Sequence, residues 1–148
     1  MVLKFKKLND NAVKPTRGSK YAAGYDLYAN LPESTAIIRP GETVKIKTGI
    51  SMEIPEGRFG AIYPRSGLAT KNGLRLANCV GIVDQDFRGD ITVPIHNDTN
   101  IDQIIHNNDR IAQIVIQPYE NVDLVESEEL SDTERGIGGF GSTGVGVK

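Results

Sequence analysis

The chain has few of the residues that build disulfides, transition-metal clusters or membrane spans. It holds one cysteine among 148 residues, Cys79, so no internal disulfide can form, which is typical of a reducing compartment. Its two histidines and this cysteine are spread along the chain and form no transition-metal motif. No apolar run is long enough for a signal peptide or a transmembrane helix. We therefore expect a cytoplasmic protein, of a cell or of an infected host, with no membrane partner.

The charge balance also excludes a class of partner. The net charge is -2 and no basic stripe is present, so the chain does not have the features of a nucleic-acid binder. Its length predicts one domain with a sizeable core. We divide it into a β-barrel at residues 1–126, and an acidic connector with a glycine-rich arm at 127–148 of the same domain.

Hydrophobic residues recur with the period of strands. Between residues 44 and 54 apolar side chains occupy even positions, and Ile91, Val93 and Ile95 alternate with polar residues or proline. Leu3 and Phe5 begin a similar pattern. Pro94 cannot donate a ladder hydrogen bond, so we expect an edge or a local irregularity there. Residues 111–116 are uniformly apolar enough to be covered on both faces.

Turn signals divide these strands at short intervals. Glycine, proline and asparagine cluster at residues 39–41, 55–57, 72–73 and 107–109, and the one helix that we expect is short, around 67–71. We therefore predict an all-β fold, a jelly-roll-like β-barrel with one short helix and a flexible Gly-rich C-terminal arm.

Two polar segments interrupt the pattern in the first half. Asp26 stands among apolar residues in AAGYDLY, where a carboxylate is costly unless it forms a salt bridge or meets a cation. In YPRSGLA, Pro64 ends a strand, Arg65 follows it, and Ser66 and Gly67 open the short helix. Helix-start N–H groups, a hydroxyl and a guanidinium form a phosphate site. The alternative is an ordinary helix cap with a surface arginine.

Two more segments follow. In NCVGIVDQDFRGD, residues 78–83 are predicted to form a tight hairpin whose amides read the edge of a base, and Phe87 to pack on a sugar. Asp84 follows two apolar residues, so we expect it to be partly desolvated and placed as a general base; a plain Asp/Gly-rich turn is the alternative. In NDRIAQI, Arg110 and Gln113 are polar residues of a buried strand and need partners.

The tail from Arg135 to Lys148 contains six glycines in fourteen residues, yet also an arginine, Phe140 and a Ser-Thr pair. Glycine lets backbone N–H groups converge on an anion, and the arginine adds a permanent charge. This combination suits an arm that orders over a triphosphate with a base attached. A disordered terminus is the alternative.

Taken together, these segments resemble the five motifs of the homotrimeric dUTPase family. AGYDLYA, PRSGLA, GIVDQDFRGD, DRIAQIVI and RGIGGFGSTG occur in the family order and with similar spacing, over nearly the whole chain. The resemblance implies Mg²⁺-dependent hydrolysis of dUTP to dUMP and pyrophosphate, which keeps uracil out of DNA and supplies dUMP. It also implies a homotrimer with active sites shared between subunits.

The resemblance implies roles for matching residues. Asp84 would activate the water that attacks the α-phosphorus. Asn78 and the backbone of Gly81 and Val83 would recognise uracil, and Phe87 would stack on the deoxyribose and exclude a 2′-hydroxyl. The family usually has tyrosine where this chain has Phe87, so one hydroxyl is missing. We expect a loss of activity no larger than one neutral hydrogen bond.

The same resemblance assigns the phosphates to Arg65, Ser66, Gly67 and Gln113. Arg135 would reach the γ-phosphate, Phe140 would close over uracil, and Gly141 and Ser142 would add contacts to the phosphates. Mg²⁺ would be held by phosphates and waters, and Asp26 would contact it only through water. Arg110 would be structural and pair with a buried carboxylate.

Two other functions remain open. A dCTP deaminase shares the fold in homologous families, but the segment GIVDQDF matches the dUTPase pattern. A binding protein that uses this scaffold to control a partner is the second alternative. Loss of Asp84 or of the tail would favour it, and both are present.

Overall fold

The computed structural model describes residues 1–139 and contains antiparallel strands with one short helix in that range. In chain order the elements are β1 (Lys4–Lys7), β2 (Tyr25–Tyr28), β3 (Thr35–Ile38), β4 (Thr43–Lys47), β5 (Ile50–Glu53), β6 (Arg58–Tyr63), α1 (Ser66–Asn72), β7 (Leu74–Leu76), β8 (Gly81–Val83), β9 (Thr92–Asn97), β10 (Gln103–His106) and β11 (Arg110–Pro118). The all-β class and the short helix are confirmed.

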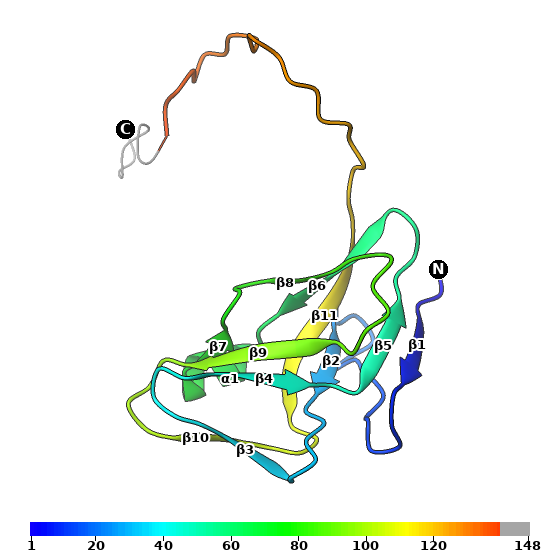
Figure 1. Ribbon diagram of the computed structural model, residues 1–148, viewed down its shortest axis with the longest axis vertical. Coiled ribbons are helices and arrows are strands. Elements are labelled where there is room, and N and C mark those ends of the chain that lie inside the picture. Colours follow the sequence, from blue (N-terminus) through cyan, green and yellow to red (C-terminus); the bar gives the residue numbers. More distant parts are fainter. Residues whose placement is uncertain (140–148) are drawn as a thin grey trace.

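The strands form four sheets within the described residues (Figure 1). The largest has the order β2-β11-β6-β8, and a second has the order β4-β9-β7. Two-stranded sheets, β1-β5 and β10-β3, complete the arrangement. The fold is jelly-roll-like, but these sheets do not close into a barrel.

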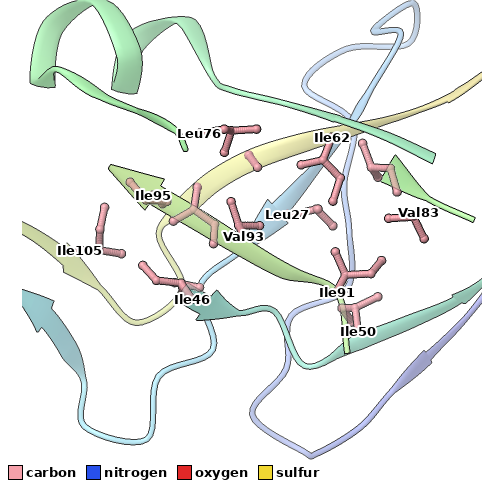
Figure 2. Packing of buried hydrophobic residues seen from close by; sticks show 14 of the residues in the cluster. Leu27, Ile46, Ile50, Ile62, Leu76, Val83, Ile91, Val93, Ile95 and Ile105 are labelled. Carbon is pink, nitrogen blue, oxygen red and sulfur yellow. The ribbon is translucent and has the colours of Figure 1, made fainter. Parts of the chain in front are cut away.

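The core lies between the two larger sheets, as the period of two predicts. Along β9 the even positions are partly exposed, while Val93, Ile95 and Asn97 are buried. Figure 2 shows apolar side chains from several strands, including Leu27, Ile62 and Ile95, converging in one cluster. Each fully buried side chain of this size stabilises the fold by about 1.5–3 kcal/mol. The strand at 111–116 is present as β11, between β2 and β6. Three of these six residues are only partly buried, so the expected cover on both faces is incomplete.

Two expectations for strands need correction. The strand expected at Leu3 and Phe5 is present as β1, but its own residues are exposed in the single chain, and only Leu3, just before it, packs partly against the core. β9 lies between β4 and β7 and is not an edge strand. Pro94 is nevertheless tolerated, because its carbonyl accepts from Ala77 N on the β7 side, where β7 has already ended. Its missing N–H faces that same open side.

Beyond β11 the chain leaves the sheets and runs as an extended segment (Figure 1). Residues 118–137 are exposed throughout, and no strand or helix occurs between residues 119 and 139. Among the described residues, no helix has the length and apolar character needed to cross a membrane.

Candidate active site

The first group of predicted site residues gathers where β2, β11 and β6 lie side by side. Gln113 on β11 is opposite Asp26 on β2 and Tyr63 on β6. The Asp26 side chain is only 12% exposed, and its Oδ1 accepts from Arg65 Nε at 3.0 Å. Its Oδ2 accepts from Arg110 Nη1 at 3.4 Å. The salt bridge expected of Asp26 and the pairing expected of Arg110 are therefore both confirmed; we call these three residues the arginine cluster.

The short helix begins beside this cluster. Arg65 occupies the N-cap position with an extended backbone, and no side chain caps the first turn. The N–H groups at the start of α1 therefore have no side-chain acceptor and remain available to an anion. Gln113 Nε2 donates to Pro64 O at 3.1 Å, which holds this side chain beside the same turn. The structure thus brings Arg65, Ser66, Gly67 and Gln113 together at the end of β6.

The segment expected to be a hairpin is instead a crossing between sheets. β7 pairs with β9, while β8 pairs with β6, so the two strands on either side of Asn78 are not partners. The chain turns through Cys79, whose φ of 60° lies in the left-handed region, and Val80 N donates to Asn78 O at 2.6 Å. Asn78 lies beside Gly81, where an added Cβ would come within 3.4 Å of Asn78 Nδ2. In the single chain, the N–H groups of Cys79 and Val80 both donate within this turn, to Leu76 O and Asn78 O.

The loop after β8 carries the predicted base and the predicted sugar platform. The Val83 side chain is buried, so only its main chain remains available for binding. Asp84 is exposed, which corrects the expected partial desolvation for the single chain. Phe87 is 42% exposed, and its backbone N–H donates to Asp84 O at 3.2 Å. Asp84 and Phe87 therefore belong to one turn.

Asp84 also lines a wide groove of about 580 Å³. Phe59 and Tyr119 form an edge-to-face aromatic pair in its wall, with ring centroids 6.5 Å apart. The other lining residues are Ile82, Asp84, Gln85 and Asp86. Two carboxylates and no cation line this groove, so these residues alone would repel a polyphosphate.

The two groups are far apart within one chain. Asp84 follows Val83, which pairs with Gly60, whereas Arg65 lies beyond the opposite end of β6. Six residues of extended chain, at about 3.3 Å each, separate the two positions by about 20 Å. The arginine cluster and Asp84 of one chain are therefore not adjacent and lie beside opposite ends of β6.

The third group belongs to the arm. Arg135 forms a local turn, in which its Nε donates to Gly138 O at 2.9 Å and Gly138 N donates to Arg135 O at 3.0 Å. Phe140, Gly141 and Ser142 lie outside the described residues. Of the predicted contacts of the arm, only Arg135 lies within the described residues.

The described residues do not provide a direct metal site of their own. Between residues 1 and 139 there is no group of three or more His, Cys, Asp or Glu side chains that could hold a metal ion. Both carboxylate oxygens of Asp26 accept from arginines, which leaves them poorly suited to direct coordination. This donor set fits a cation that arrives on the triphosphate and meets Asp26 only through water.

Sequence reasoning assigned no role to several residues around Asp84. Phe59 and Tyr119 join the groove wall only because β6 and β11 are paired, and that pairing has no signature in the local sequence. Arg88 and Gly89 lie inside the quoted segment GIVDQDFRGD, but their contacts within the loop depend on its fold. In the sequence, only the charged residues and glycine of this short loop indicate that Arg88 and Gly89 could have a role.

These features define a class of protein: an all-β chain in which a cluster of arginines beside a short helix, an exposed turn and a separate exposed carboxylate lie at different ends of one sheet. A family model described as dUTPase matches residues 10–144. A deoxyuridine 5'-triphosphate nucleotidohydrolase of Nautilia profundicola is 49% identical over 144 residues, covering 97% of this chain and 99% of that protein. The chain belongs to the dUTPase family.

Other relatives extend this result. The corresponding enzyme of Yarrowia lipolytica is 46% identical and covers 98% of this chain and 90% of that protein. The Staphylococcus bacteriophage 80alpha dUTPase with dUPNHPP superposes with a TM-score of 0.88 at 32% identity, covering 97% of this chain and 99% of that one. A mutant dUTPase from phage phi11 of S. aureus, described with a structural Mg(II) ion, has a TM-score of 0.80 at 26% identity, covering 89% and 100%.

Proposed function

We propose that the chain hydrolyses dUTP to dUMP and pyrophosphate, as a homotrimer whose active sites combine residues of neighbouring subunits. The observation that carries this proposal is the separation of the arginine cluster from Asp84 along β6. We propose that each site takes the arginine cluster and Asp84 from different chains. Closed symmetric assembly then generates identical sites at each interface.

The extended segment after β11 supports contact with a neighbour. Its apolar side chains are almost fully exposed in the single chain: Val122 at 68%, Leu124 at 95%, Val125 at 85% and Leu130 at 88%. A row of exposed apolar residues on an extended segment is typical of a surface that packs on a partner. We propose that residues 127–148 act as connector and arm, and that residues 1–126 form the body of the subunit.

Uracil would be read by the turn at Asn78 and the backbone of Gly81 and Val83. Backbone amides at a fixed turn distinguish uracil from cytosine, because the two bases present opposite donor and acceptor patterns. The exposed ring of Phe87 would pack on deoxyribose and leave no space for a 2′-hydroxyl. Selectivity for dUTP over dCTP and UTP follows. Selectivity over dTTP would come from a turn that leaves no room for the 5-methyl group.

The chemistry requires no covalent enzyme intermediate. Asp84 would accept a proton from the water that attacks the α-phosphorus in line, and the α–β bridging oxygen would leave with pyrophosphate. Arg65, Ser66, Gly67 and Gln113 of a neighbouring subunit would hold the phosphates. When it is bound to the triphosphate, Mg²⁺ supplies neutralising charge.

The arm would complete the site. Arg135 would contact the γ-phosphate, Phe140 would cover the uracil ring, and Gly141 and Ser142 would add hydrogen bonds to the phosphates. Covering the substrate excludes bulk water and strengthens each charged contact. Cys79 is a free and exposed thiol, which suits a reducing compartment, and we propose a cytoplasmic location.

The test measures pyrophosphate release with Mg²⁺ from dUTP, dTTP, dCTP and UTP in parallel reactions. Fast release from dUTP alone is expected. Release of ammonia from dCTP would indicate a deaminase instead. A folded protein that is inactive on all four nucleotides would contradict catalysis and favour the binding-protein alternative.

A further inference from the structure

Gly89 lies directly under the ring of Phe87. A Cβ added to Gly89 would come within 2.6 Å of Phe87 Cζ, 2.9 Å of Cε2 and 3.4 Å of Cε1. These atoms form the far edge of the ring, so that edge rests on the backbone of Gly89. The φ of Gly89 is not in the left-handed region, so space and not backbone conformation accounts for glycine at this position.

The backbone that carries this ring is held from several sides. Arg88 Nη1 donates to Gln85 O at 2.7 Å and to Phe87 O at 3.0 Å. Ser51 Oγ, which is largely buried, donates to Arg88 O at 2.8 Å and ties the loop to β5. Asp90 Oδ1 accepts from Gly49 N at 2.9 Å at the far end of the loop. A methyl group at position 89 would therefore displace the ring more easily than the backbone.

We propose that Gly89 is a positioning residue that sets the orientation of Phe87, and through it the discrimination between deoxyribose and ribose. The inference rests on the proposed function, in which Phe87 packs on the sugar. A tilted ring would open space beside C2′ and weaken the packing on deoxyribose. One added carbon in such a pocket changes selectivity by roughly tenfold or more.

The experiment compares kcat/KM for dUTP and UTP in four proteins: wild type, Gly89→Ala, Phe87→Ala and the double variant. Gly18→Ala is the matched control, because a Cβ at Gly18 would meet no atom within 4 Å and its φ is not in the left-handed region. We expect Gly89→Ala to lower the dUTP/UTP ratio about tenfold, mainly through KM for dUTP. Gly18→Ala should keep the wild-type ratio.

The double variant separates positioning from general damage. If Gly89 acts through the ring, adding Gly89→Ala to Phe87→Ala should cause no further loss of discrimination, because no ring remains to be displaced. If Gly89→Ala alone folds poorly, the dUTP/UTP ratio of the double variant can still be compared with that of Phe87→Ala, because the double variant lacks the clash between the ring and the added methyl group. A further loss in the double variant would overturn the inference.

Failure of this inference and failure of the proposed function give different results. An unchanged ratio in Gly89→Ala, with a reduced ratio in Phe87→Ala, would refute the role of Gly89 and leave dUTP hydrolysis intact. A wild-type protein that does not hydrolyse dUTP would refute both.

Discussion

Asp84 is exposed at the end of β8 and lines the groove together with Asp86. We expect Asp84→Asn to bind a non-hydrolysable dUTP analogue nearly as well as wild type, because the shape of the side chain is kept. Its kcat should fall by about 10²–10⁴, the usual contribution of a general base. Single-turnover kinetics and calorimetric binding measure the two quantities.

Asp86→Asn is the matched control for this prediction. It removes a carboxylate from the same groove two residues away, so it reproduces the change in local charge. Its kcat should stay close to that of wild type. Equal losses in the two variants would mean that charge in the groove, and not a specific base at Asp84, matters.

The arginine cluster has a consequence for stability. Asp26 is 12% exposed and Arg110 is 49% exposed, whereas Lys4 and Glu53 form a surface pair at 71% and 51%. Arg110→Met should lower the free energy of unfolding by about 1–3 kcal/mol, because it removes one of two arginine partners from a mostly buried carboxylate. Lys4→Met should cost about 0–1 kcal/mol. Urea unfolding at matched protein concentration measures both losses of free energy. A larger loss for Lys4→Met than for Arg110→Met would contradict the prediction.

At the scale of the elements, the sequence predicts where strands and the helix lie, but not which strands pair with one another. The alternation at Ile91, Val93 and Ile95 gave the buried face of β9, and the helix beginning at Ser66 followed from the proline, serine and glycine around it. The crossing at Asn78 was missed because a tight turn between two strands has the same sequence whether the strands pair or separate. Partners for β7 and β8 are fixed by distant segments, β9 and β6.

Asn97 joins elements that the sequence does not mark as neighbours. It is fully buried, and its Nδ2 donates to Ile38 O at the end of β3 and to Ile101 O, both at 2.8 Å. Its Oδ1 accepts from Thr99 N at 2.9 Å and from Thr99 Oγ1 at 2.7 Å. Asn97→Ala should lower the free energy of unfolding by about 2–4 kcal/mol, since buried groups lose their partners and a cavity remains.

The exposed Asn100, in the same turn, provides the control for Asn97. Asn100→Ala should change the free energy of unfolding by less than about 0.5 kcal/mol. Denaturant unfolding of both variants measures the difference. If Asn97→Ala were as stable as Asn100→Ala, the hydrogen-bond network at Asn97 would not hold β3 and β9 together.

At the scale of the whole molecule, the body and the arm should separate in function. All strands between residues 1 and 139 end by Pro118, so removal of residues 135–148 leaves the sheets complete. We expect the truncated protein to remain a folded trimer by light scattering and to lose most pyrophosphate release from dUTP, because Arg135 and the residues after it no longer cover the phosphates. Full activity after truncation would exclude the arm from the site.

The five segments predict the candidate site residues as a set, and the family resemblance implies sites shared between subunits, but local sequence does not show which residues lie too far apart to act together in one chain. Local sequence cannot show that the strand β6 places Asp84 and Arg65 at opposite ends, about 20 Å apart by residue spacing. That separation becomes visible only once β8 is paired with β6. It leads to the most direct test of the proposed assembly.

Subunits carrying Asp84→Asn and subunits carrying Arg65→Met should each form inactive trimers. After the two are mixed, unfolded and refolded together at equal amounts, about a quarter of the sites would combine an intact Asp84 from one chain with an intact Arg65 from its neighbour. Pyrophosphate release should therefore recover to about a quarter of the wild-type rate. The double variant Asp84→Asn/Arg65→Met, refolded alone or with either single variant, is the control and should stay inactive. Absence of recovery from mixtures shown to contain mixed trimers would mean that each site takes both residues from the same chain.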